Sequence, residues 1–144
     1  MRWFARDLEI RYSDTDQMGI VHNGTYPIYC EIGRTDLCAR AGIPYHLMER
    51  EGYFLMVAEL TCRYKAPILY GDQVYVNTAI SRLQRRFIAF DYEIRDREQD
   101  RLLFTGSSKH IVTGRERSRV SLPDPWFQFF ERARDGDEPP DARA

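Results

Sequence analysis

The sequence contains few cysteines, little net charge and no long apolar run. Its three cysteines, Cys30, Cys38 and Cys62, are odd in number and have no paired spacing, which argues against a disulfide framework or a structural zinc site. We expect buried thiols in a reducing compartment instead. The formal net charge of −1 leaves no global field to attract nucleic acid or an acidic membrane surface.

Membrane and export signals are also missing from the sequence. No run approaches the roughly 20 apolar residues of a membrane-spanning helix, and residues 1–7 contain no apolar signal region. No internal repeat is visible either. We therefore expect a cytoplasmic protein with no nucleic-acid partner and no stable membrane insertion.

Hydrophobic residues, in contrast, make up 43% of the 144 residues, and aromatic residues make up 13%, which is enough for the core of one domain. Residues 2–12 alternate in polarity and predict a strand, whereas residues 25–41 place apolar side chains at 3.6-residue spacing and predict a long helix. Gly33 inside this helix suggests close approach to another backbone, unless it is merely tolerated. Further strands are predicted at residues 53–65, 73–83, 86–95 and 101–113.

The connections between these four strands are mostly short, which implies antiparallel pairing. In the strand at 53–65, the even-numbered apolar residues from Met56 to Tyr64 are expected to share one face. One helix cannot cover both faces of such a sheet. We therefore expect a two-layer α+β domain in which the other face meets solvent or a partner.

Turn and cap residues divide the rest of the chain. Asn23 or Thr25 is the expected N-cap of the long helix, and a short helix or turn is predicted at residues 44–51. A final short helix is expected to have Asp124 as its N-cap and to end the domain at residue 133. Residues 134–144 are charged and contain proline, and we expect them to be disordered.

The chemistry-bearing residues concentrate between the first strand and the long helix, in residues 12–26. This stretch contains two carboxylates, Asp14 and Asp16, and an imidazole. A carboxylate here could act as nucleophile or general base, or it could simply stabilise a turn or cap the helix. Asn23 and Gly24 place backbone N–H groups at the helix start, where they suit an anion or a developing oxyanion.

The chain resembles the hotdog-fold acyl-CoA thioesterases in one extended pattern, Tyr12-x-Asp14-Thr15-Asp16-x-x-Gly19-Ile20-Val21-x-x-x-x-Tyr26, followed in the helix by Glu31 and Arg34. It is most similar to the branch that contains 4-hydroxybenzoyl-CoA thioesterase and YbgC, over about residues 5–120. The resemblance implies a single hotdog domain at residues 1–133, with a five-stranded antiparallel sheet wrapped around one long helix in β-α-β-β-β-β order.

The resemblance also implies roles for particular residues. Asp16 would attack the thioester carbonyl or activate a water that does so, and the backbone N–H of Asn23 would hold the thioester oxygen. Many members of the branch have Tyr then His where this chain has His22 then Asn23. The imidazole is therefore displaced by one residue, and His22 is either catalytic or a structural, pocket-lining residue. No metal or cofactor is implied, because coenzyme A is part of the substrate.

Several residues are expected to contact the acyl-CoA. Arg85 and Arg86 lie in the turn between the third and fourth strands, and their guanidinium groups match the phosphates of coenzyme A. The alternative is that this turn simply faces solvent. The full set of expected substrate-binding residues is Tyr12, Gly24, Tyr26, Lys65, Arg85 and Arg86.

Two other functions remain open at this point. A hotdog dehydratase or isomerase would use His22 with Asp16 for proton transfer, and a non-catalytic acyl-CoA-binding protein would use the same fold.

The uncovered sheet face and the abundant aromatic residues favour a homodimer or homotetramer. The resemblance implies that the second strands of two subunits pair and that the active sites lie at their interface. The sequence does not choose between aryl, short aliphatic and longer aliphatic acyl groups.

Overall fold

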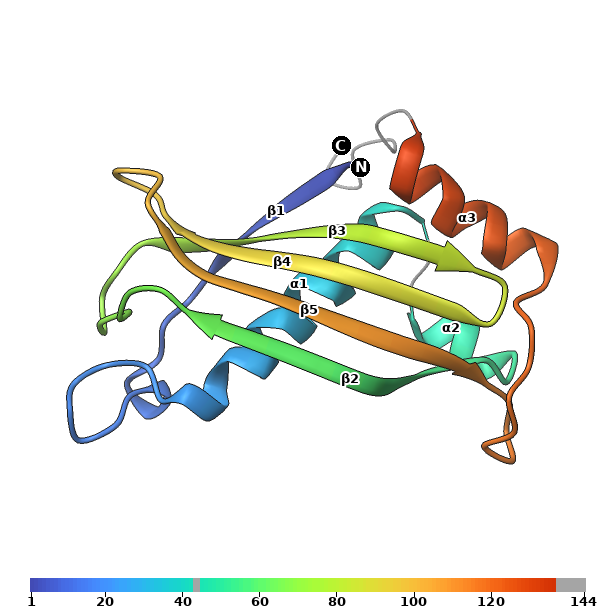
Figure 1. Cartoon of the computed structure of the whole chain (residues 1–144), viewed down its shortest axis with the longest axis horizontal. Helices are drawn as coiled ribbons and strands as arrows, with labels where there is room; N and C mark the ends of the chain where they lie inside the picture. The colour runs from blue at the N-terminus through green and yellow to red at the C-terminus, as the bar shows by residue number, and fades with distance from the viewer. Residues whose placement is uncertain (43–44, 137–144) are drawn as a thin grey trace.

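A computed structural model describes residues 1–42 and 45–136 and shows one sheet with a long helix against it (Figure 1). The strands are β1 (Trp3–Leu8), β2 (Phe54–Tyr64), β3 (Val74–Gln84), β4 (Phe87–Asp96) and β5 (Leu102–Thr113). The helices are α1 (Tyr26–Arg40), α2 (Tyr45–Arg50) and α3 (Asp124–Asp135). Two 3₁₀ turns, η1 (Tyr12–Asp14) and η2 (Asn23–Thr25), lie between β1 and α1. No helix within the described ranges is long and apolar enough to cross a membrane.

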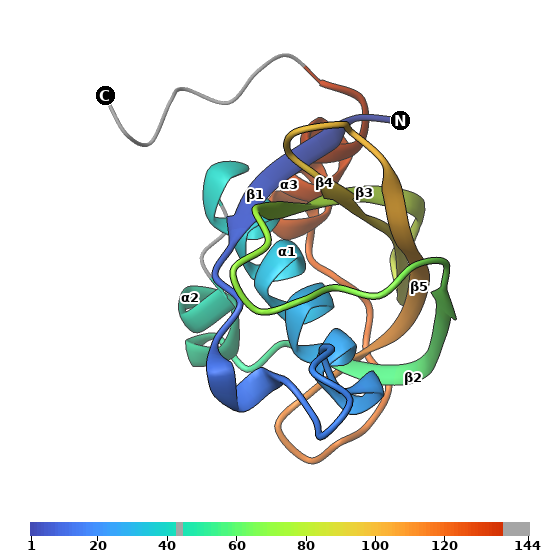
Figure 2. The same ribbon diagram turned by 90° about the vertical axis from the view of Figure 1, so that its left-hand side faces the viewer.

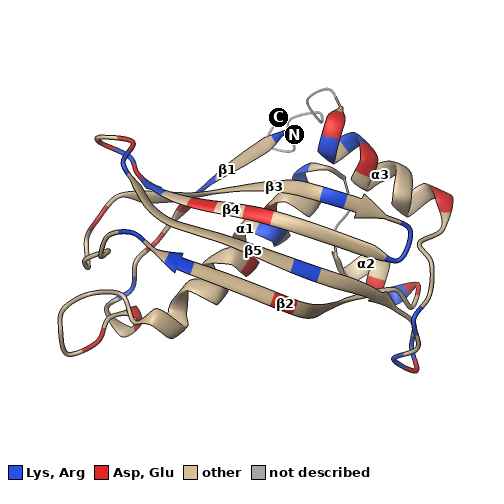
Figure 3. Ribbon diagram, in the orientation of Figure 1, with Lys and Arg blue, Asp and Glu red and all other residues tan. Residues whose placement is uncertain are grey.

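The strands form one antiparallel sheet in the order β1-β3-β4-β5-β2, so β1 and β2 are its two edges. The sheet curves around α1, which lies along its concave side (Figure 2). Charged residues of both signs occur along β2 and β4, and a basic residue occurs in β5 (Figure 3). The predicted α+β architecture, with five antiparallel strands wrapped around one long helix, is confirmed.

Helix α1 packs its predicted apolar face onto the sheet. Tyr29, Cys30 and Leu37 are buried on this face, at the spacing that brings helical side chains to one side. Gly33 lies on the same face, where a Cβ would meet the side chains of Thr78 and Val76 of β3. The glycine therefore does mark a tight contact, but with side chains and not with another backbone as predicted. The largest fully buried aromatic side chains of the core are Tyr29, Tyr92, Phe4, Phe90, Phe104 and Phe130.

The first strand is shorter than the sequence predicted. It ends at Leu8, and the chain turns into η1 at Tyr12 instead of continuing as a strand. The turn forms because the Asp14 side chain accepts a hydrogen bond from the Arg11 N–H at 3.0 Å. Local side-chain bonding has therefore overridden the alternating pattern at this end of the strand.

The predicted apolar face of the second strand is also wrong at one position. The pairing of β2 with β5 shifts between Val57 and Glu59, which leaves Ala58 as an extra residue in a β-bulge. Met56 consequently pairs with Ile111 and lies on the outer face of the sheet, away from the face that Leu60 shares with buried Ser108.

The C-terminal helix differs from its prediction in two ways. Asp124 is the first residue of α3 and Pro123 is the N-cap, with no capping hydrogen bond from a side chain. The Asp124 carboxylate pairs with Arg85 instead. The helix also continues through Arg134 and Asp135, which we expected to be disordered. The rest of that predicted tail, residues 137–144, lies outside the described residues, as does residue 44 at the start of the predicted short helix.

Candidate active site

The chain between β1 and α1 folds back on itself in a tight loop at residues 16–20. The Asp16 N–H donates to the Ile20 carbonyl at 2.9 Å, and the Gly19 N–H donates to the Asp16 carbonyl at 3.0 Å. Gly19 has a φ of +78°, which a residue without Cβ adopts easily. Asp16 Oδ1 accepts a hydrogen bond from the Met18 N–H at 2.8 Å, whereas Oδ2 has no partner among the residues described. One carboxylate oxygen is therefore fixed and the other is free.

Asp14 is only 3% exposed and holds this loop against the start of α1. Its Oδ2 accepts hydrogen bonds from the Arg11 N–H at 3.0 Å and the Tyr29 hydroxyl at 2.9 Å, and Oδ1 accepts from the Arg11 guanidinium at 3.0 Å. Burial would raise the pKa of Asp14, but these hydrogen bonds and the charge of Arg11 outweigh it and lower the pKa. The Asp14 carbonyl accepts from the His22 N–H at 2.8 Å and the Thr25 hydroxyl at 3.3 Å.

His22 caps the turn that leads into α1. Its Nδ1 accepts a hydrogen bond from the Gly24 N–H at 2.9 Å. Thr25 occupies the N-cap position of α1, as one of two expected residues, but its side chain makes no capping bond. The Asn23 N–H donates to no group in the described ranges, whereas the Asn23 carbonyl accepts from the Tyr64 hydroxyl at 2.8 Å. One of the two predicted oxyanion donors is therefore free, and the other is occupied.

These groups line a pocket of about 540 Å³ between the loop and the chain that follows β2. Figure 2 looks onto this end of the molecule. The pocket walls are mostly apolar or aromatic, with few polar groups, as is usual for small-molecule sites. The lining residues are Asp16, Met18, Ile20, Val21, His22, Asn23, Tyr26, Tyr64, Lys65, Ala66 and Pro67. Five of the predicted site residues, Asp16, His22, Asn23, Tyr26 and Lys65, are thus brought together.

Two predicted substrate-binding residues are close in sequence but do not line this pocket. Tyr12 is 78% exposed, and its ring packs edge-to-face against Tyr70 with 5.8 Å between the ring centroids. Gly24 contributes its N–H to the His22 cap, so this donor is not free for a substrate.

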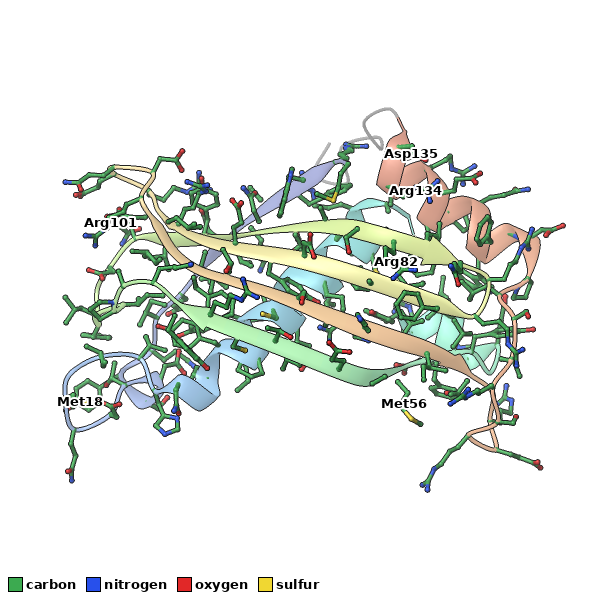
Figure 4. The ribbon with its side chains drawn as sticks, viewed as in Figure 1. Met18, Met56, Arg82, Arg101, Arg134 and Asp135 are labelled. Carbon is green, nitrogen blue, oxygen red and sulfur yellow. The ribbon has the colours of Figure 1, made fainter. Side chains whose placement is uncertain are left out.

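Arg85 and Arg86 do not line this pocket. They lie in the turn between β3 and β4, which is at one end of the molecule in Figure 3, whereas Met18 of the pocket loop is at the other end in Figure 4. Arg85 pairs with Asp124 and lies over the Phe127 ring, 4.4 Å from its centroid. It therefore holds α3 in place.

Tyr64 is a residue of the site that the sequence did not single out. The alternating pattern of the strand predicted that Tyr64 lies on its apolar face. The Tyr64 ring does meet the Tyr26 ring edge-on, with 4.9 Å between the ring centroids. The hydrogen bond from its hydroxyl to the Asn23 carbonyl joins residues 41 apart in sequence. No local pattern signals such a contact.

A second polar cluster lies between α1 and the sheet, outside the pocket lining. Arg34 donates to the Tyr92 hydroxyl at 3.0 Å, this hydroxyl lies 2.5 Å from Ser108 Oγ, and Ser108 Oγ lies 2.8 Å from His110 Nε2. His110 is fully buried. Burial and the nearby charge of Arg34 lower the pKa of His110 to about 4, so this imidazole is neutral at pH 7.

Comparison with known proteins identifies the family of this fold and sequence. The family model described as the thioesterase-like superfamily matches residues 10–130. YneP of Bacillus subtilis, assigned as an acyl-CoA thioesterase, is 32% identical over 134 residues, which cover 90% of this chain and 96% of YneP.

Two solved structures show the same architecture. The hypothetical protein TT1821 of Thermus thermophilus matches with a TM-score of 0.83 and 34% identity, over 88% of this chain and 96% of that one. The DHNA-CoA thioesterase of Staphylococcus aureus matches with a TM-score of 0.84 and 30% identity, over 92% of this chain and 89% of that one. The resemblance stated from the sequence, and the hotdog fold it implied, are confirmed.

Proposed function

The chain belongs to the thioesterase-like superfamily, and we propose that it hydrolyses the thioester bond of an acyl-CoA to a free acid and coenzyme A. One observation carries the proposal: one pocket is lined both by Asp16, whose Oδ2 has no partner among the described residues, and by Asn23 at a helix start, whose N–H has none there either. YneP, assigned as an acyl-CoA thioesterase, and the Staphylococcus aureus DHNA-CoA thioesterase support coenzyme A as the leaving group.

Asp16 acts as nucleophile or as general base in this reaction. As a nucleophile, it adds to the carbonyl carbon, the C–S bond breaks, coenzyme A leaves as a thiolate that takes up a proton, and water then cleaves the anhydride. As a base, it takes a proton from the water that attacks the carbonyl. Both routes consume one water and yield an acid and a thiol. Neither route requires a metal or an organic cofactor.

Negative charge develops on the thioester oxygen in both routes. The Asn23 N–H donates to no described group and lies at the start of the helical segment, where the peptide dipoles also favour negative charge. Lys65 in the pocket wall adds a cation that suits the polar groups of coenzyme A. Arg85 and Arg86 would reach its phosphates only at the site of another subunit, because the turn between β3 and β4 that contains them lies at the opposite end of the molecule from the loop that precedes α1 (Figure 1).

A hotdog dehydratase or isomerase is the second candidate, because Asp16 and His22 line the same pocket. A non-catalytic acyl-CoA-binding protein is the third. The products separate all three: a thioesterase releases free thiol, a dehydratase or isomerase forms or moves a double bond without thiol release, and a binding protein does neither.

The test is thiol release from a panel of aryl, short aliphatic and long aliphatic acyl-CoAs. We expect Asp16→Asn to bind acyl-CoA normally and to lose kcat by at least ~100-fold, the low end for a general acid–base group. Asp14→Asn is the matched control, since it changes a buried carboxylate that has no free oxygen. It should lose much less activity, while thermal melts show whether each variant is folded. An active Asp16→Asn beside an inactive, folded Asp14→Asn would refute the assignment of Asp16.

A further inference from the structure

We infer that His22 donates a hydrogen bond from its Nε2–H to the thioester oxygen, in a tautomer that the Gly24 N–H fixes, so that His22 and the Asn23 N–H form the oxyanion site together. This inference rests on the proposed thioesterase function. It starts from the 2.9 Å hydrogen bond between the Gly24 N–H and His22 Nδ1.

The direction of this hydrogen bond determines where the imidazole carries its proton. A backbone N–H can only donate, so Nδ1 must present its lone pair to Gly24. A neutral imidazole has one N–H, and with Nδ1 as the acceptor the proton lies on Nε2. The contact is close: a Cβ added at Gly24 would lie 3.0 Å from His22 Nδ1.

The other side of the ring is free to act on a substrate. His22 is exposed and lines the pocket with Asp16 and Asn23. Its Nε2 makes no hydrogen bond within the ranges that the structure describes. His22 and Asn23 are consecutive, so the Nε2–H of the His22 ring and the backbone N–H of Asn23 belong to neighbouring residues of one pocket wall, and Asp16 lines the same pocket.

This tautomer also restricts what His22 can do. The lone pair of Nδ1 is committed to Gly24, and Nε2 already carries a proton, so neutral His22 has no free lone pair. It can therefore donate a hydrogen bond but cannot accept a proton unless the cap at Gly24 breaks. The dehydratase or isomerase hypothesis needs an imidazole base, and the geometry of the cap disfavours it.

Two substitutions distinguish the two roles of the His22 side chain, the Nδ1 acceptor that caps the Gly24 N–H and the Nε2–H donor that faces the substrate. His22→Asn keeps an acceptor near the position of Nδ1, and asparagine is a preferred capping residue, but it has no group at the position of Nε2. His22→Gln places an amide N–H near the position of Nε2 and loses the short cap. We expect His22→Asn to melt within about 1 °C of wild type and to lose roughly 100-fold in kcat with little change in KM, which is the low end for a lost oxyanion donor.

His22→Gln is expected to melt at a lower temperature and yet retain more kcat than His22→Asn. If His22→Asn keeps the wild-type kcat, or if it raises KM and leaves kcat unchanged, the oxyanion role is wrong. A folded His22→Gln that is less active than His22→Asn would also overturn it.

The tautomer is testable without any activity. Long-range ¹⁵N–¹H NMR correlations of the neutral His22 ring should show the proton on Nε2 in the free protein. A proton on Nδ1 would overturn the inference. If the wild-type protein releases no thiol from any acyl-CoA, the proposed function fails, whereas the tautomer result stands on its own.

Discussion

A Cβ atom added at Gly33 would lie 2.2 Å from Thr78 Oγ1, so helix α1 and strand β3 approach more closely than a side chain at residue 33 allows. Thr78 is fully buried, and its hydroxyl has no hydrogen-bond partner in the described part of the chain. The contact fixes the depth at which α1 sits against the sheet.

Gly33→Ala should therefore destabilise the protein by about 2 kcal/mol, as overpacking of a dense core does. Thr78→Ala removes an unpaired buried hydroxyl, so adding it to Gly33→Ala should recover part of the loss. Urea unfolding of the two single variants and the double variant measures both effects. A Gly33→Ala midpoint equal to wild type would show that the helix can move away from β3 without cost.

Tyr64→Phe should lower kcat a few-fold with little loss of stability. The substitution removes only the hydroxyl that donates to the Asn23 carbonyl at 2.8 Å, and the ring packing against Tyr26 remains. The segment that carries the proposed oxyanion donor, the Asn23 N–H, then loses one of the hydrogen bonds that hold it in place. Tyr70→Phe is a suitable control because Tyr70 is exposed and does not line the pocket. Equal kcat values for both variants and wild type would show that the Tyr64 hydroxyl does not contribute to catalysis.

His110 should make the protein less stable in acid. Its pKa is lowered from 6.5 to about 4 by burial and by Arg34, so the unfolded chain binds a proton at this residue before the folded chain does. The stabilisation is complete above about pH 6.5 and is lost as the pH falls toward about 4. Between pH 7 and pH 4.5 the loss should be about 2 to 3 kcal/mol.

His110→Gln isolates this contribution from the carboxylates that also titrate. The free energy of unfolding of both proteins, measured in urea at pH 7 and pH 4.5, gives the comparison. The difference between the two pH values should be smaller for His110→Gln than for wild type. Parallel pH profiles would contradict the assignment.

Strand β2 should pair with β2 of a second copy to form a dimer. It is an edge strand of eleven residues that exposes apolar side chains, among them Met56, Leu60 and Val57, which is 50% exposed. Exposed edges of this kind favour pairing with another strand. Val57→Lys should shift the protein toward a 17.0 kDa monomer in light scattering, whereas Leu47→Lys on α2 should not. A monomeric wild type at micromolar concentration would refute the prediction.

The sequence was sufficient for those features that depend on local periodicity. Alternation and helical spacing predicted each long element to within a few residues. The glycine at position 33 indicated a tight contact, although the contact is with side chains of β3 and not with another backbone. The bulge at Ala58 was not predictable in this way, because an extra residue in a strand becomes visible only when the partner strand is known. Met56 therefore moved to the opposite face.

The candidate site was predictable only in part. Asp16, His22, Asn23, Tyr26 and Lys65 do meet in one pocket, largely because four of them lie in one short stretch. The roles of Asp14 and Tyr64 depend on hydrogen bonds to Tyr29 and Asn23, which are 15 and 41 residues away. The pattern of residues did not show that Arg85 packs against α3 and not near the loop at residues 16–20. Which end of the sheet a turn occupies depends on the direction of the strands it joins, and this direction is known only from the fold.

Two segments that help to form the pocket wall, one after β1 and one after β2, join the two edges of the sheet. The Val21 N–H, in the segment after β1, donates to the carbonyl of Ile68, in the segment after β2, at 2.8 Å, and Ile20 forms a bridge with Leu69. These two edges are separated by β3, β4 and β5, and they meet only when the sheet has curled around α1. Contacts between residues so far apart in the chain carry a high loop-closure cost and form slowly. During refolding, the far-ultraviolet circular dichroism signal should recover before enzymatic activity does.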